Sequence, residues 1–270
     1  MATQDDTPLT PAFEASPGAK PKLHILLAED NFINQQMTRA TLTKKGHTVI
    51  IAANGIEVLE ALAKDHFDLI LMDVQMPDMD GIQATAAIRE IEKQTGEHIR
   101  IVALTAHAFE EDRDKCLAAG MDDYLAKPVR SSELLKNIEN GGTCSVLAPD
   151  TAPDVPVDLR DFENRCSGDQ RLIGQLIQLF FQNYHKYLAD IREAMDRRDP
   201  RDLEYRAHFL KGVLTNFSAR PARIIAARLE EMAKDEKLND VESVYAALEE
   251  QMARVRLCLE AVITPTPGPC

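Results

Sequence analysis

Four short apolar segments in the first half of this sequence each end in residues that could take part in chemistry. In chain order these residues are Glu29, Asp30, Asp73, Thr105 and Lys127. Because clustered carboxylates repel one another unless a hard cation lies among them, the three acids suit Mg²⁺. A metal ion and an ammonium beside a carboxylate suit phosphoryl transfer, in which negative charge on the phosphoryl oxygens must be neutralised.

In that reaction each residue has a separate role. Asp73 would be the nucleophile and would form an aspartyl phosphate. Thr105 would donate a hydrogen bond to a phosphoryl oxygen, and Lys127 would pair with another. Alone, each of these residues is usually a turn residue, a helix cap or a surface charge. Their occurrence together, in order, is what indicates the phosphoryl-transfer site.

The elements that must position these residues alternate between strand and helix. Strands are expected at 23–28, 48–52, 69–73, 99–104 and 123–126, and helices at 31–45, 56–64, 82–92, 110–119 and 131–139. Five strands, each followed by a helix, predict a parallel sheet covered on both faces. The carboxyl ends of the strands meet at one edge of such a sheet, where open α/β folds place their sites.

The composition changes in the second half of the chain. Residues 141–157 are rich in Gly, Pro and small residues, as in a linker. Beyond them the strand signals disappear, and apolar positions at helical spacing predict helices at 169–197, 200–217, 221–234 and 241–262. The expected organisation is a disordered leader (1–21), an α/β domain (22–140), the linker, a four-helix bundle (158–263) and a tail (264–270).

A histidine in the bundle is a second candidate for chemistry. Leu203, Ala207, Leu210, Leu214 and Phe217 form the core seam of their helix, since they fall at alternating steps of four and three. His208 is expected beside this seam, at the edge of the water-facing side. Lys211, one turn away, could neutralise a phosphoryl group, and Gly212 would let another protein approach the imidazole closely. The other six histidines are expected to be solvated surface residues.

The composition excludes several classes of function. A net charge of −13 argues against a general nucleic-acid-binding protein. No apolar stretch approaches 18 residues, so membrane insertion is not expected. The five cysteines form no CxxC pair, which favours reduced thiols in a cytoplasmic protein over disulfides or zinc. Without a Gly-rich phosphate loop, the protein is not expected to phosphorylate itself from ATP.

The first half of the chain also resembles a known family. The motifs LLAEDNFIN, ILMDVQMPDMDG, IVALTAHA and DDYLAKP resemble the receiver domain of two-component response regulators, most of all receivers fused to hybrid sensor kinases. The resemblance implies a flavodoxin-like (βα)5 fold. It also implies Mg²⁺ held by Asp30, Asp73 and the backbone carbonyl of Gln75, with Glu29 assisting.

The same resemblance implies further roles. Asp73 would be phosphorylated, and a Thr105/Tyr124 switch would respond to it, with the tyrosine ring moving inward. The Lys127-Pro128 peptide bond would be cis, which would aim the ammonium.

The helical half resembles a second family. The segment AHFLKG, residues 207–212, is similar to the motif of histidine phosphotransfer (HPt) domains. This resemblance implies that His208 carries a phosphoryl group on a ring nitrogen, with help from Lys211, Gly212 and Gln178 or nearby polar residues. The chain departs from the family just downstream, because Val213 and Leu214 stand where small polar residues are usual and Ser218 stands where a glycine is usual.

Together these features predict an intermediate of a multistep phosphorelay. Asp73 would accept a phosphoryl group from a sensor histidine kinase, and His208 would pass it to or from another response regulator. Nine Lys/Arg against five Asp/Glu in residues 192–228 would suit docking to an acidic receiver site. One alternative is a phosphorylation-switched binding module that does not use His208. A dehalogenase-type phosphatase is disfavoured, because Gln75 stands where that chemistry needs a general acid.

Overall fold

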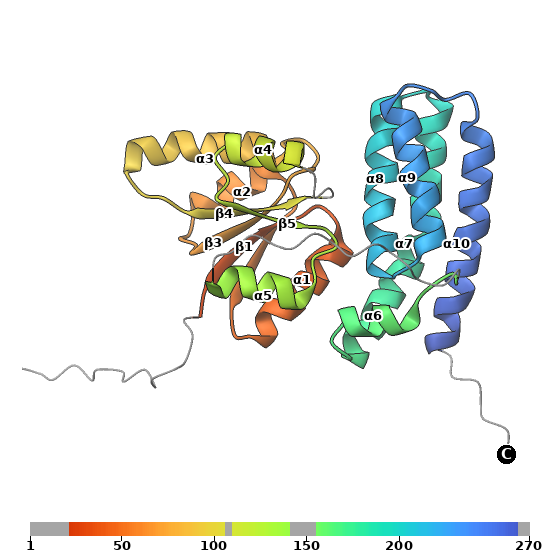
Figure 1. Ribbon diagram of the computed structural model, residues 1–270, viewed down its shortest axis with the longest axis horizontal. Coiled ribbons are helices and arrows are strands. Elements are labelled where there is room, and N and C mark those ends of the chain that lie inside the picture. Colours follow the sequence, from red (N-terminus) through yellow and green to blue (C-terminus); the bar gives the residue numbers. More distant parts are fainter. Residues whose placement is uncertain (1–21, 106–109, 141–154, 264–270) are drawn as a thin grey trace, which may run out of the picture.

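A computed structural model describes residues 22–105, 110–140 and 155–263 of the chain. The expected leader and tail, most of the expected linker, and His107 lie outside these residues. The described chain forms an α/β domain and a helical domain that lie side by side, and helix α1 (Phe32–Lys44) of the first packs against the second (Figure 1).

The sheet of the first domain has five parallel strands in the order β2-β1-β3-β4-β5. They are β1 (His24–Ala28), β2 (Thr48–Ala52), β3 (Leu69–Asp73), β4 (Arg100–Thr105) and β5 (Asp123–Ala126). Strand β3 is central and all five of its residues are buried, as expected for an apolar strand covered on both faces.

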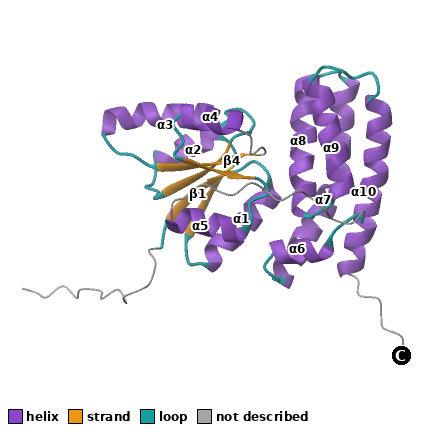
Figure 2. Cartoon of the chain, viewed as in Figure 1, coloured by secondary structure: helices purple, strands orange, loops and turns teal. Residues whose placement is uncertain are grey.

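Helices cover both faces of this sheet (Figure 2). Besides α1 they are α2 (Gly55–Leu62), α3 (Gly81–Thr95), α4 (Glu110–Ala118) and α5 (Ser131–Asn140). Leu42 of α1 and Leu134 of α5 pack against one face, whereas Val58 of α2 and Ile88 of α3 pack against the other. The predicted flavodoxin-like (βα)5 fold is therefore confirmed.

Local sequence signals fix where the helices next to the sheet edge begin. The Asn31 side chain accepts a hydrogen bond from the Ile33 amide and caps α1. Asp80 and Gln83 form a capping box at the start of α3. A Cβ on Gly81 would lie 2.1 Å from the carbonyl oxygen of Asp73, so only glycine fits where α3 starts behind that residue.

The second domain is the predicted helical bundle. Its long helices are α7 (Gln170–Asp196), α8 (Pro200–Asn216), α9 (Arg220–Lys234) and α10 (Val241–Ile263). A short helix, α6 (Leu159–Arg165), was not predicted, because seven residues are too few to show a helical repeat. It buries Phe162, whose ring centroid lies 5.0 Å from that of Phe217. Val157, within the range expected for the linker, is buried in the bundle core.

No helix in the described part of the chain has both the length and the apolar character needed to cross a bilayer.

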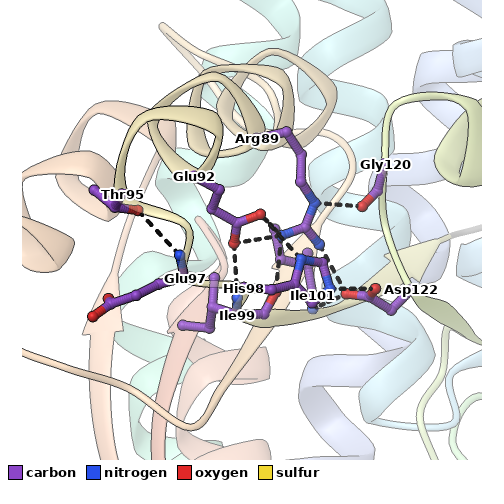
Figure 3. Close-up of polar contacts among 9 residues, drawn as sticks. All are labelled: Arg89, Glu92, Thr95, Glu97, His98, Ile99, Ile101, Gly120 and Asp122. Carbon is purple, nitrogen blue, oxygen red and sulfur yellow. Dashed lines mark hydrogen bonds and ion pairs between the residues drawn. The ribbon is translucent and has the colours of Figure 1, made fainter.

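One of the remaining histidines in the described residues is buried, not solvated on the surface as the sequence predicted. His47 is buried, and its Nδ1 accepts a hydrogen bond from the Leu23 amide at 3.1 Å. His98 is exposed and lies in an ion-pair cluster with Glu92 and Asp122, just before strands β4 and β5 (Figure 3). Its Nδ1 is 3.1 Å from Glu92 Oε2 and its Nε2 is 3.0 Å from Asp122 Oδ1.

This cluster makes His98 a pH-dependent stabiliser of the α/β domain. Hydrogen bonds to Asp122 and Glu92 raise the pKa of His98, because both ring nitrogens can donate only when the ring is charged. Its contribution to stability is therefore full below the unfolded pKa of about 6.5 and is lost as pH rises through the higher folded pKa. The contribution should be below about 1 kcal/mol, since the side chain is exposed.

NMR titration of the histidine rings checks this prediction. We expect His98 to titrate above about 6.5, and Asp122→Asn to bring it down towards that value. An unchanged midpoint in the variant would show that Asp122 does not hold the charged ring.

Candidate phosphoryl-transfer site

The carboxyl ends of β1, β3 and β5 bring together the acids and the lysine that the sequence singled out. The side chain of Asp73, at the end of β3, is buried, and so is that of Glu29, after β1. Lys127, directly after β5, places its Nζ 2.5 Å from Asp73 Oδ2 and 2.7 Å from Glu29 Oε2. One ammonium therefore bridges two carboxylates that are shielded from water.

Burial and neighbouring charges have opposite effects on the pKa values of Asp73 and Lys127. Burial raises the pKa of Asp73 well above its usual range; Lys127 opposes this rise, and Glu29 adds to it. Burial would lower the pKa of Lys127, but the carboxylates of Asp73 and Glu29 raise it above its usual value. The lysine is therefore charged, and its ammonium opposes the effect of burial on Asp73.

The acidic group has the chemistry of a site for a hard divalent cation. Glu29, Asp30 and Asp73 each offer a carboxylate oxygen, and these oxygens lie within 4.8 Å of one another. Burial and the neighbouring Glu29 also raise the pKa of Asp30, so negative charge is costly here without a cation. Oxygen donors at this spacing fit Mg²⁺. The Gln75 amide donates to Asp73 Oδ1 at 3.2 Å, which places the backbone of Gln75 at the site.

Thr105 and Tyr124 lie on neighbouring strands. Thr105 is buried at the end of β4, and Tyr124 is partly buried on β5. The register pairs Thr105 with Ala126 and Ala103 with Tyr124. Because side chains alternate along a strand, Thr105 and Tyr124 occupy diagonal positions on the same face of the sheet. The Lys127-Pro128 peptide bond is cis.

A carboxylate that the sequence analysis missed holds His208. Glu230 of α9 places Oε1 2.7 Å from His208 Nδ1, and its Oε2 is 2.6 Å from Lys211 Nζ. Burial would raise the pKa of Glu230, but the bond from His208 and the charge of Lys211 lower it below its usual value. An ionised carboxylate can only accept, so His208 Nδ1 carries a proton, and in the neutral ring Nε2 is the nitrogen with the lone pair.

His208 is more enclosed than the sequence predicted. Its side chain is only 16% exposed, because Glu230 covers one side and the α/β domain lies opposite. Gln178 is exposed on α7, and the polar neighbour of the imidazole is Glu230 instead. Nothing in the spacing of Glu230 marks it as a partner of His208, since the two lie on different helices.

One cavity of about 320 Å³ between the domains joins the two sets of residues. Asp30, Asp73 and Lys127 line it from the α/β domain. His208 and Lys211 line it from the bundle. The phosphoryl acceptors inferred separately from the two halves of the sequence therefore face a common space.

The segment 192–228 has more basic than acidic residues, but some of its arginines pair with neighbouring acids. Arg206 pairs with Asp190 at 3.0 Å, and Arg192 pairs with Glu242 at 2.8 Å. Arg223 does line the cavity, as does Arg165 of α6. Basic side chains of the bundle therefore line the same cavity as the acids of the α/β domain.

Comparison with known proteins identifies both domains. Residues 25–139 match the family model of the response regulator receiver domain, and residues 175–258 match that of the Hpt domain. The chain therefore contains a receiver domain followed by an Hpt domain, the architecture that the sequence motifs predicted. Both are phosphotransfer domains of two-component systems.

The chain is also similar to hybrid sensor kinases. It is 31% identical over 249 residues to the sensor histidine kinase GacS of Pseudomonas protegens, covering 88% of this chain and 27% of that protein. Its receiver half is 46% identical over 120 residues to hybrid signal transduction histidine kinase B of Dictyostelium discoideum, covering 41% of this chain and 6% of that protein. The chain thus spans about a quarter or less of the length of these relatives.

Among solved structures, the receiver domain of the sensor histidine kinase PA1611 of Pseudomonas aeruginosa, determined with a magnesium ion in its active site cleft, is 40% identical. The match covers 45% of this chain and all of that one, with a TM-score of 0.41.

Proposed function

We propose that this protein is a phosphorelay intermediate in which a phosphoryl group passes between Asp73 and His208. The observation that supports the proposal is the shared cavity, which Asp73 and His208 line from the two domains. A sensor histidine kinase would supply the phosphoryl group to Asp73, and a separate response regulator would exchange it with His208. A receiver domain followed by an Hpt domain supports both of these partners. We place the protein in the cytoplasm, where such partners operate.

The residues divide the chemistry between them. The Asp73 carboxylate attacks phosphorus, and the bond between phosphorus and the donor nitrogen breaks with its electron pair left on the donor imidazole. In the next step the Nε2 lone pair of His208 attacks phosphorus, and the P–O bond to Asp73 breaks with its electrons left on the carboxylate. Lys127 and Thr105 contact phosphoryl oxygens, and Tyr124 responds to the occupied site.

Mg²⁺ would be held by Asp30, Asp73 and the backbone carbonyl of Gln75, with Glu29 adjacent. When bound, it supplies positive charge to the phosphoryl oxygens. The chain's own contribution is to bury the acids, to hold Lys127 against Asp73, and to fix the His208 tautomer through Glu230. Lys211 adds a second ammonium, which pairs with Glu230 beside His208, and Gly212 keeps the approach to the imidazole open.

Labelling with radioactive acetyl phosphate and Mg²⁺ tests the proposal. An aspartyl phosphate is labile in alkali, whereas a phosphohistidine is stable in alkali and labile in acid. We expect both kinds of label in the wild type, no label in Asp73→Asn, and only alkali-labile label in His208→Gln. Alkali-labile label unaffected by His208→Gln, with no phosphohistidine even when a second phosphorylated receiver is added, would favour a binding module instead.

A further inference from the structure

One stripe of helix α8 faces the receiver domain. Tyr205, Phe209, Gly212 and Asn216 follow one another at steps of four, three and four, so they share one side of the helix. His208 and Lys211 lie on the adjoining side, towards Glu230. The stripe is thus placed to determine which receiver reaches the imidazole.

The polar groups of this stripe bond to residues next to the receiver site. The Tyr205 hydroxyl donates to Asp30 Oδ2 at 2.8 Å, and the Asn31 amide donates to the Phe209 carbonyl oxygen at 3.4 Å. The Asn216 amide also donates to Asn34 Oδ1.

Apolar contact supports the same docking. Ile33, in the first turn of α1, is 1% exposed, and its buried neighbours belong to the core cluster of the bundle. Met37, one turn further along α1, packs against the same cluster. Ile33 is buried by residues of the other domain. This burial indicates that the two surfaces form a specific interface.

We propose that Tyr205 is the positioning residue by which His208 recognises this chain's own receiver domain, so that phosphoryl transfer between Asp73 and His208 takes place within one molecule. The inference rests on the proposed function and names the partner of His208. Asp30 neighbours Glu29 in the acid pair, so its bond to Tyr205 fixes α8 relative to Asp73. Without the Tyr205 hydroxyl, this hydrogen bond no longer holds His208 at a fixed distance from Asp73.

Gly212 fits this arrangement. A Cβ at Gly212 would lie 3.7 Å from Asn31 Nδ2 and 3.9 Å from Asn34 Nδ2, which is ordinary van der Waals contact. An alanine therefore fits the docked state, whereas a larger side chain meets the receiver. The space beside Gly212 is smaller than the sequence analysis suggested, because a single methyl group there would already contact Asn31 and Asn34.

Rapid labelling of the full-length chain with acetyl phosphate and Mg²⁺ tests the proposal. The rate at which phosphohistidine appears on His208 is followed at protein concentrations spanning about a hundredfold. Transfer within one molecule gives a rate that is independent of concentration. A mixture of Asp73→Asn with His208→Gln chains can transfer only between molecules, and there the rate must rise with concentration.

Tyr205→Phe removes the hydroxyl and is expected to lower the intramolecular rate by about tenfold or more, the usual effect of losing a hydrogen bond to a charged group. The rate is expressed relative to the labelling of Asp73, so that any effect on the Asp30 carboxylate, which Tyr205 contacts, is separated from transfer to His208. Gly212→Leu should lower the same rate, because its larger side chain meets Asn31 and Asn34 of the receiver. Tyr245→Phe is the matched control, because its hydroxyl bonds to the Leu188 carbonyl oxygen away from the receiver.

Each outcome distinguishes the inference from the function on which it rests. No phosphohistidine in any arm, even with a separate phosphorylated receiver, overturns the proposed relay itself. Phosphohistidine that forms at a rate proportional to concentration leaves the relay intact but overturns transfer within one molecule. A concentration-independent rate unchanged by Tyr205→Phe overturns the positioning role of Tyr205.

Discussion

Lys127→Met is expected to reduce phosphoryl transfer to Asp73 by about a hundredfold or more, because it removes the only ammonium in contact with that carboxylate among the described residues. The same change leaves Glu29, Asp30 and Asp73 without their shared cation. Their combined negative charge should then bind Mg²⁺ more tightly, by about tenfold. Transfer and metal binding therefore change in opposite directions.

Labelling with acetyl phosphate gives the transfer rate, and titration calorimetry gives the affinity for Mg²⁺. Lys93→Met is a suitable control, since Lys93 is an exposed residue on α3 paired with Glu90. Circular dichroism must show that the variant remains folded, because breaking a buried ion pair costs about 3–5 kcal/mol. If transfer and Mg²⁺ binding were lost together, Lys127 would act by holding the site in shape and not on the phosphoryl group.

Glu230→Gln is expected to slow phosphorylation of His208 by about tenfold to a hundredfold. The ionised carboxylate accepts the Nδ1 proton and pairs with Lys211, and a neutral amide weakens both interactions. Because Nδ1 is occupied, the phosphoryl group should be on Nε2 in the wild type. Glu230→Ala should allow either nitrogen to react, since nothing then fixes the tautomer.

Phosphorus and nitrogen NMR of the phosphorylated chain identifies the nitrogen that carries the group. Glu231→Gln is the matched control, because Glu231 is adjacent in sequence and exposed. Phosphate on Nδ1 in the wild type would contradict the tautomer assigned to His208. Equal rates in Glu230→Gln and wild type would show that the carboxylate charge has no part in transfer.

In the receiver domain, most of the fold could be predicted from local sequence patterns. The alternation of five strand segments with five helical segments predicted a parallel sheet, and a parallel sheet places the carboxyl ends of its strands at one edge. Asp73 and Lys127 were therefore expected at one place although 54 residues separate them. The bundle helices were predicted in the same way, except α6, which is too short to show a period.

Contacts between side chains of different helices and domains could not be predicted from sequence periodicity and were seen only in the tertiary structure. Glu230 reaches His208 because α8 and α9 pack with one particular rotation and offset, and the apolar stripes that drive this packing do not specify which polar residues meet beside them. Tyr205 meets Asp30 only because the bundle docks on α1, where Ile33 completes an apolar cluster from another domain. Sequence by itself predicted the two domains and singled out Asp73 and His208 as candidate phosphoryl acceptors. Their common cavity, the contact of His208 Nδ1 with Glu230 and the contact of Tyr205 with Asp30 depend on packing between elements that are distant in the chain.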